Sequence, residues 1–270
     1  ARLIAMPINL EQLFISPTWS RKINDTNSIG IAINLAYQMF SATGLQPFQG
    51  MSSSPGNMTN NGTDTSTGIG LRLGWTGDIT PQITLGATYQ PKTKMSKFSK
   101  YAGLFADQGS FDIPANYGVG IAYKATPQVT TALDITQIKY SGVSSVGNSS
   151  AIPLPFGSSG GPGFGWKDMT VFKLGVAYQY EPDVTLRAGF NHNSQQIGSN
   201  DAFLNLLAPG VVQNHLTLGG TWKLANKAEL SVAYIHAFSQ TVSGPIASTV
   251  GGGNASIKMS EDSIGVMYGW

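Results

Sequence analysis

The sequence predicts an all-β chain that folds as an antiparallel transmembrane β-barrel. Three observations carry this prediction. Segments of about ten residues alternate between apolar residues and small or polar ones. Only 11% of the residues are charged, whereas a soluble domain has about 25%. Short and long connections between the segments alternate strictly along the chain, as in barrels of the Gram-negative outer membrane.

The composition excludes several other classes of protein. The chain of 270 residues has no cysteine, which removes disulfides and thiolate metal sites. No apolar run approaches about 18 residues, so we expect no transmembrane helix. The formal net charge of +2 gives no indication of a nucleic-acid partner. The chain begins at Ala1 without a signal peptide, and we therefore expect a processed or truncated product.

The clearest hairpin lies within residues 166–190. Phe172, Leu174 and Val176 share one parity, and Lys173 and Gly175 lie on the other. A polar turn at 181–183 follows, after which the alternation resumes. In a soluble sandwich the apolar face would be core, whereas in a membrane barrel it meets lipid and the polar face lines the interior.

About eleven strands follow from the same pattern along the chain. We expect them at 13–23, 28–41, 68–75, 83–92, 117–124, 129–140, twice within 166–190, and at 212–224, 228–238 and about 255–270. Long outside loops are expected at about 42–64, 94–115, 141–165, 198–210 and 243–254. Tight turns, including one at 225–227, join the other strand ends. Greek-key sandwiches have no such regular order of connections.

An odd number of strands leaves the predicted barrel open. Bacterial single-chain barrels have even counts, and an unpaired edge in lipid costs several kcal/mol per backbone group. We therefore treat residues 1–270 as one barrel domain that lacks N-terminal strands. An alternative is that residues 2–10 form a further strand.

Charge and aromatic placement predict how the barrel sits in its membrane. Lysines such as Lys94, Lys100 and Lys258 fall toward the long-loop ends of strands, where lipopolysaccharide would attract them. Tyrosines and tryptophans near the strand ends are typical of an aromatic girdle. The last strand alternates and ends at Trp270, which resembles the signal that barrel-assembly machinery reads.

Several short motifs resemble a known family. These are Trp166-Lys-Asp, Leu174-Gly-Val-Ala-Tyr178, Thr185-Leu-Arg-Ala-Gly189, Leu216-Thr-Leu-Gly-Gly-Thr-Trp222 and Gly68-Ile-Gly-Leu-Arg-Leu-Gly74. In order and spacing they are similar to the long-chain fatty-acid and hydrocarbon transporters of the Gram-negative outer membrane (FadL type). The resemblance implies a fourteen-stranded barrel plugged by an N-terminal hatch, of which this chain would hold the last eleven strands.

The resemblance also implies passive uptake of hydrophobic compounds. A ligand would be caught between two outside loops, pass to an interior pocket and leave sideways through the wall. By strand order these loops are 42–64 and 94–115. Their apolar residues are Leu45, Phe48, Met51, Met58, Phe98, Tyr101, Leu104 and Phe105. Such exposed clusters mark binding surfaces, although the same residues could serve only to pack the loops together.

Polar and charged residues on the interior parity include Arg72, Lys173, Arg187 and His215. Inside a barrel such groups usually pair with one another, but a cation could also meet a ligand carboxylate. The fatty-acid carriers place a lysine shortly before the Trp-Lys-Asp motif, whereas here residues 160–165 carry no cation. We therefore expect neutral or aromatic hydrocarbons to be accepted at least as well as fatty acids.

No motif in the sequence indicates an enzyme. The three histidines, at 192, 215 and 236, are too scattered for a metal site, and we expect neither metal nor cofactor. There is no nucleophile-elbow motif. Two further functions remain open at this point: an adhesin-like or assembly barrel whose loops bind a partner, and a general porin for small polar solutes.

Overall fold

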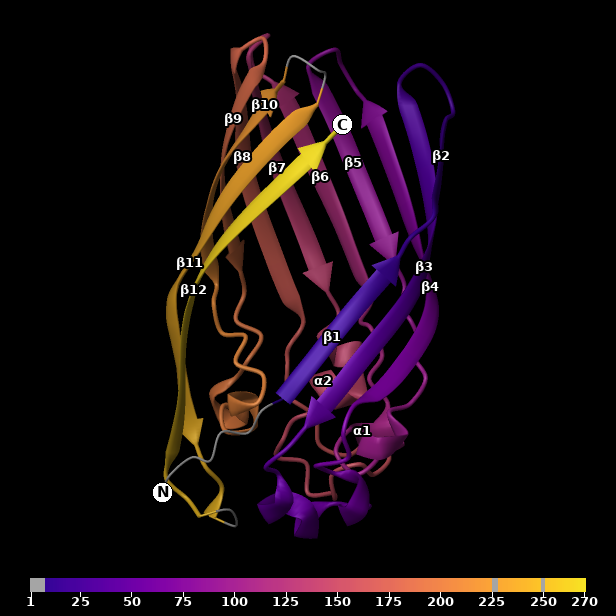
Figure 1. The fold of residues 1–270 in the computed structure, drawn as a ribbon, viewed down its shortest axis with the longest axis vertical. Coiled ribbons are helices and arrows are strands. Elements are labelled where there is room, and N and C mark those ends of the chain that lie inside the picture. Colours follow the sequence, from indigo (N-terminus) through magenta and orange to yellow (C-terminus); the bar gives the residue numbers. More distant parts are fainter. Residues whose placement is uncertain (1–7, 225–227, 249–250) are drawn as a thin grey trace.

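The computed structural model describes residues 8–224, 228–248 and 251–270, and these form one antiparallel sheet (Figure 1). Its strands are β1 (Ile8–Ile15), β2 (Thr18–Lys22), β3 (Asn27–Ala42), β4 (Asp64–Asp78), β5 (Ile83–Gln90), β6 (Asn116–Lys124), β7 (Val129–Ile138), β8 (Met169–Glu181), β9 (Val184–Asn193), β10 (Asn214–Lys223), β11 (Glu229–Pro245) and β12 (Asn254–Gly269). Apart from β2, which pairs only with β3, each strand is hydrogen-bonded to its neighbours in chain order.

The structure has twelve strands, where about eleven were predicted, because the first expected strand is broken. Both β1 and β2 pair with β3, and residues 16–17 interrupt them. Pro17 has no N–H to donate to a ladder, which explains the interruption. Its carbonyl still accepts a hydrogen bond from the Ile33 backbone N–H at 3.1 Å. The broken strand also begins earlier than expected, at Ile8, and residues 2–7 of the alternative strand lie outside the described part.

Two other strands are longer than the pattern suggested. β11 continues to Pro245, beyond the expected end at 238, and a β-bulge between Ala237 and Gln240 explains the difference. The bulge breaks the apolar alternation that marks a strand in the sequence. β4 begins at Asp64, before the expected start at residue 68. Its first residues are polar, and they pair with the C-terminal end of β3. The turn expected at 225–227 lies outside the described residues.

The apolar face of the sheet points outward. On β3, Ile31, Ile33 and Leu35 are 42–45% exposed, whereas Asn34 and Gln38 on the opposite parity are at most 4% exposed. Strands of a soluble protein bury the apolar parity instead. This inverted pattern confirms that the sheet is the wall of a membrane barrel. The small and polar parity is called the inner face below.

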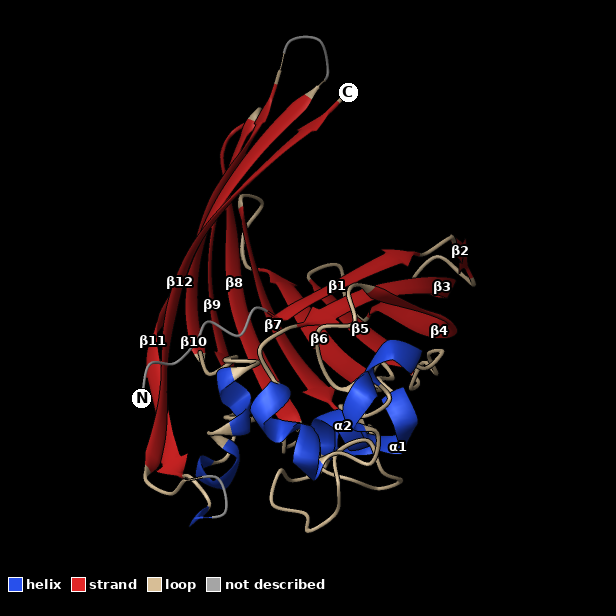
Figure 2. Cartoon of the chain, turned by 60° about the horizontal axis from the view of Figure 1, so that its bottom comes forward, coloured by secondary structure: helices blue, strands red, loops and turns tan. Residues whose placement is uncertain are grey.

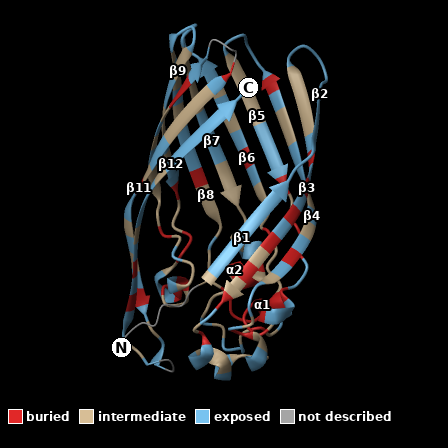
Figure 3. Ribbon diagram, in the orientation of Figure 1, coloured by how far each residue is buried: buried red, intermediate tan, exposed pale blue. Residues whose placement is uncertain are grey.

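The connections divide the molecule into two ends. Tight turns join strands at one end, shown at the top of Figure 1. At the other end lie the long connections, which carry the short helices α1 (Ala106–Gly109) and α2 (Ser144–Gly147) and several 3₁₀ turns (Figure 2). We call residues 43–63, 91–115, 139–168 and 194–213 loops 1 to 4. Buried residues gather at this end and along β3 (Figure 3).

β1 and β12 stand at the two ends of the strand order. Within the described residues no ladder joins them, so both outer edges are unpaired. Across those same residues, no helix is long or apolar enough to cross a membrane.

Candidate ligand-binding site

Loops 1 and 2 share one apolar cluster with the outer end of β3. Phe40 of β3 stands at its centre, with ring centroids 4.7 Å from both Tyr101 and Phe105 and 5.7 Å from Phe98. Phe105 in turn lies 4.8 Å from Phe111. The tilted and edge-to-face arrangements are those that aromatic pairs prefer. We call this group, with Leu45, Met58 and Leu104, the aromatic loop cluster.

Hydrogen bonds fasten the two loops around this cluster. The Tyr101 hydroxyl donates to the Gly62 carbonyl at 2.6 Å and accepts from the Ala42 N–H at 3.1 Å. The Thr59 hydroxyl accepts from the Leu45 N–H at 3.2 Å. These contacts satisfy backbone groups that would otherwise be buried without a partner. Loop 1 and loop 2 therefore form one packed unit at the outer end of the wall.

The residues predicted for the ligand groove divide into two groups. Six are buried within the aromatic loop cluster: Leu45, Met58, Phe98, Tyr101, Leu104 and Phe105. The other two are accessible. Phe48 is half-buried, with its ring centroid 6.1 Å from that of Phe203 in loop 4, and Met51 is 43% exposed. The loops thus bring the predicted residues together, and ligand binding by them stays a prediction.

Sequence reasoning missed part of the cluster. Phe40 lies on the small and polar parity of its strand, and an aromatic residue on that parity is a signal of an interior contact. Phe156 and Phe164 from loop 3 and Leu207 from loop 4 also pack against the cluster. Phe156 and Phe164 come from a glycine- and serine-rich segment where no periodicity marks them, whereas Leu207 ends an apolar run at residues 203–207.

The four predicted interior residues all lie on the inner face. Arg72 donates to the Gln90 side-chain carbonyl, with Nη2 at 2.8 Å and Nε at 3.2 Å. Arg187 donates to the Thr221 hydroxyl at 2.7 Å. His215 Nδ1 lies 3.2 Å from Asn191 Nδ2. Lys173 is different, because its register partner is an acid, Asp134 on β7.

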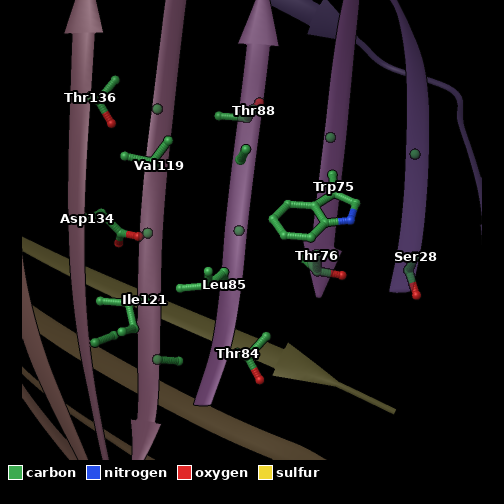
Figure 4. A pocket seen from close by; sticks show the side chains of 18 of the residues that line it. Ser28, Trp75, Thr76, Thr84, Leu85, Thr88, Val119, Ile121, Asp134 and Thr136 are labelled. Atoms are coloured by element: carbon green, nitrogen blue, oxygen red, sulfur yellow. The ribbon is translucent and has the colours of Figure 1, made fainter. Parts of the chain in front are cut away.

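A hollow of about 620 Å³ lies against the turn-side half of the wall (Figure 4). Small and hydroxyl-bearing residues of β2 to β7 dominate its lining, among them Ser28, Gly30, Thr84 and Thr136. Asp134 and Lys173 are the charged residues that line it. The glycines of the inner face leave this space open because they carry no side chain.

A second hollow, of about 490 Å³, lies on the wall beside the strand break. It is lined mainly by outward-facing apolar residues of β1, β3 and β4: Leu13, Ile15, Leu35, Tyr37 and Ile69. Ile15 is the last residue of β1, directly before the break at 16–17. This groove therefore faces the lipid and not the interior.

Two carboxylates connect neighbouring loops through hydrogen bonds. Asp201 of loop 4 is buried and accepts hydrogen bonds from the Ser149 hydroxyl, at 3.0 Å, and from the Ser150 N–H and hydroxyl of loop 3, at 2.8 and 2.7 Å. Asp107 of loop 2 accepts from the Gly160 N–H of loop 3 at 2.8 Å. That hydrogen bond lowers the pKa of the Asp107 carboxyl against the opposing effect of its burial.

Among the residues that the structure describes, no group of three or more His, Asp or Glu side chains is placed to hold a metal ion.

Comparisons with known proteins agree on one family and one fold. The family model described as outer membrane protein transport protein (OMPP1/FadL/TodX) matches residues 1–263. A search of curated proteins gives no match. Solved structures with the same fold include the toluene transporter TodX of Pseudomonas putida, with 19% identity, a TM-score of 0.66, and 97% of this chain and 69% of that chain covered.

Two further structures are similar over the same part of the chain. A FadL homologue of Pseudomonas aeruginosa has 14% identity and a TM-score of 0.67, with 97% of this chain and 67% of that chain covered. The toluene transporter TbuX of Ralstonia pickettii has 18% identity and a TM-score of 0.60 over the same shares of the two chains. At these identities the likeness concerns the fold.

Proposed function

Because the chain belongs to the OMPP1/FadL/TodX family of outer membrane transport proteins, we propose that it takes up hydrophobic compounds by loop capture and lateral transfer through the wall. The outward apolar face of the sheet suits a protein of the outer membrane. One observation carries the proposal most directly. The long loops enclose an apolar cluster at one end of the wall, and the inner face leads from it to an open hollow.

Capture begins at the accessible part of the loop end. Phe48 and Phe203 present a half-buried aromatic pair at the contact of loops 1 and 4, and Met51 is exposed nearby in loop 1. Aromatic and methionine side chains suit ligands of varied shape. Tyr101 and Phe98 are fully buried and contact a ligand only once the aromatic loop cluster opens.

The ligand class that fits best is the neutral hydrocarbon, with aromatic compounds included. Residues 160–165 carry no cation, and the Gly160 N–H already binds the carboxylate of Asp107. A ligand carboxylate at that place would meet the negative charge of Asp107, and residues 160–165 supply no cation to offset it. TodX and TbuX are described as toluene transporters, which agrees with this choice.

Release into the membrane takes place at the strand break between β1 and β2. The ladder is interrupted there, and the apolar groove on the outer face lies beside it. The break also lies next to the interior, because the Ser16 hydroxyl donates to the inward-facing Asn34 side chain at 2.9 Å. A compound leaving at this point passes from the inner face directly into lipid.

Two further partners belong to this proposal. Exposed lysines near the loop end, such as Lys94 and Lys258, contact the anionic sugar-lipid of the outer leaflet. Trp270, almost fully exposed at the end of the chain, contacts the barrel-assembly machinery.

The test is toluene binding by the chain in detergent, with palmitate and hexadecane measured alongside. Phe48→Ala is expected to weaken toluene binding about fivefold, since it removes an aromatic contact worth about 1 kcal/mol. Phe190→Ala is the matched control, because Phe190 lies on the outer face of β9. Equal affinities of the wild type and Phe48→Ala would contradict capture at this place. Binding of palmitate without binding of toluene or hexadecane would contradict the choice of neutral hydrocarbons as the ligand class.

A further inference from the structure

The inner face of β3 forms a continuous track between the loop end and the hollow. Its residues, in order from the outside, are Phe40, Gln38, Ala36, Asn34, Ala32, Gly30 and Ser28. Phe40 belongs to the aromatic loop cluster, while Gly30 and Ser28 line the hollow. Ala36 packs with Met95 and Ile113 of loop 2, which lie over this track. A compound that moves from the cluster to the hollow along β3 must pass Gln38.

Gln38 is unusual for its setting. Its side chain is 0% exposed, and among the described residues neither Nε2 nor Oε1 has a hydrogen-bond partner. Leaving a buried polar group unpaired costs about 1–3 kcal/mol, and nearly all such groups in proteins are paired. An apolar residue at this position would avoid that cost.

Two polar neighbours of Gln38, Ser66 and Asn34, already bond to other groups. Its register partner Ser66 donates its hydroxyl to the Ser96 carbonyl of loop 2. Next along the track, Asn34 donates to the Gln90 side-chain carbonyl at 3.3 Å, and Gln90 also binds Arg72. On either side along the strand, Phe40 and Ala36 offer only apolar contact. The amide of Gln38 therefore lies between two apolar clusters, and among the described residues no side chain pairs with it.

A second buried polar group without a hydrogen-bond partner lies further along the track. Thr93 of loop 2 is 1% exposed, and its hydroxyl has no partner among the described residues. It lies against Gly70, where any Cβ would overlap the hydroxyl, and Gly70 is the register partner of Asn34. The inner side of β3 and β4 thus holds two unpaired polar groups in succession.

We infer that Gln38 is a binding residue for the hydroxyl group of hydrophobic alcohols or phenols on their way to the hollow. A hydroxyl accepts a hydrogen bond from Nε2 and donates one to Oε1, so a single ligand group satisfies both atoms. A hydrocarbon satisfies neither. A carboxylate can only accept, which leaves Oε1 unpaired beside a negative charge. This inference rests on the proposed function, and it adds hydroxylated compounds to the neutral ligands.

The test compares two compounds of nearly the same shape, p-cresol and p-xylene, which differ by a hydroxyl in place of a methyl group. Their binding is measured on the chain in detergent, for the wild type and for Gln38→Leu. We expect Gln38→Leu to weaken p-cresol binding about tenfold and to leave p-xylene binding unchanged, because only the hydroxyl contact is lost. p-Toluate is expected to bind more weakly than p-cresol to the wild type.

Two variants complete the design. Gln38→Met keeps the unbranched shape of the side chain and is expected to give the same result as Gln38→Leu. Agreement between the two variants shows that the effect does not come from a packing defect caused by the branched leucine. Gln128→Leu makes the same change in the exposed turn between β6 and β7, away from the track, and is expected to leave the ratio of the two affinities unchanged. An unchanged ratio in both Gln38 variants would overturn the inference while the proposed function stands. A wild type that binds neither compound would overturn both.

Discussion

At the scale of single residues, the base of loop 3 is closed by one charged pair. Lys139 directly follows β7 and Asp168 directly precedes β8, and their side chains form an ion pair. Asp168 also accepts from the Ser141 N–H at 3.0 Å and from its hydroxyl at 2.8 Å. Burial alone would raise the pKa of the Asp168 carboxyl, but the contact with Lys139 and the hydrogen bonds from Ser141 together outweigh it and lower the pKa.

The direction of this shift predicts how loop 3 responds to pH. A carboxyl with a lowered pKa stabilises the folded loop above its ordinary pKa of about 3.9. That contribution is lost as the pH falls further, through the lowered pKa of the folded state. We expect hydrogen exchange of residues 139–168 to be constant from pH 7 down to about 4 and to rise below it, after correction for the intrinsic rate.

Asp168→Asn should show faster exchange of the same segment already at pH 7, by at most about fivefold, since exposed ion pairs contribute about 1 kcal/mol or less. Asp183→Asn, in the exposed turn between β8 and β9, is the control. Identical exchange of the wild type and Asp168→Asn at pH 7 would show that the pair does not hold the loop.

At the scale of elements, loop 2 lies directly against the inner face of β4. Gly68 forms a bridge with Met95, and a Cβ at Gly68 would overlap the Met95 sulfur and the Lys94 carbonyl. At Gly70 a Cβ would overlap the Thr93 hydroxyl. The glycines at these two positions of the Gly68–Gly74 motif therefore provide room for the loop.

This packing predicts different costs for the same change at neighbouring glycines. Gly70→Val should lower the free energy of unfolding by about 1–3 kcal/mol, because the added side chain displaces Thr93. Gly74→Val on the same face is the control, since nothing lies within 4 Å of its Cβ position. Urea unfolding in detergent, followed by tryptophan fluorescence, measures both. Equal urea concentrations at the unfolding midpoints of Gly70→Val and Gly74→Val would mean that loop 2 does not pack on β4.

At the scale of the whole molecule, the sheet is apolar outside and polar inside. Outward residues such as Leu174 are strongly exposed, whereas Lys173, Gly175 and Ala177 on the same strand face inward. In water this arrangement would expose a large apolar surface, whereas in a bilayer the same surface is solvated by lipid. The membrane is therefore part of what stabilises the fold.

Moving a charge by one residue along β8 tests this orientation. Leu174→Lys places the charge on the lipid face and should cost about 2–4 kcal/mol near the bilayer midplane. Gly175→Lys places it on the inner face, where Lys173 already stands, and should cost much less. Refolding yield into lipid vesicles, measured by protease protection, compares the two. A lower yield for Gly175→Lys than for Leu174→Lys would reverse the assignment of faces.

The sequence by itself determined the class of fold, most of the strands and the alternation of turns and long loops. These features are local, because a period of two and a turn signal can be read within a few neighbouring residues. It failed where the local pattern is broken, at Pro17 and at the bulge near Ala237. Its choice of loops 1 and 2 for the ligand followed from the family resemblance.

Only the tertiary structure decided which of the loop residues are accessible. Tyr101 and Phe98 are buried where β3 brings Phe40, about sixty residues away in the chain, against both rings. In the same way, Gln38 is buried without a hydrogen-bond partner among the described residues, while its register partner Ser66 bonds to Ser96 of loop 2. Burial of a loop side chain depends on segments distant in sequence, and no local pattern contains that information.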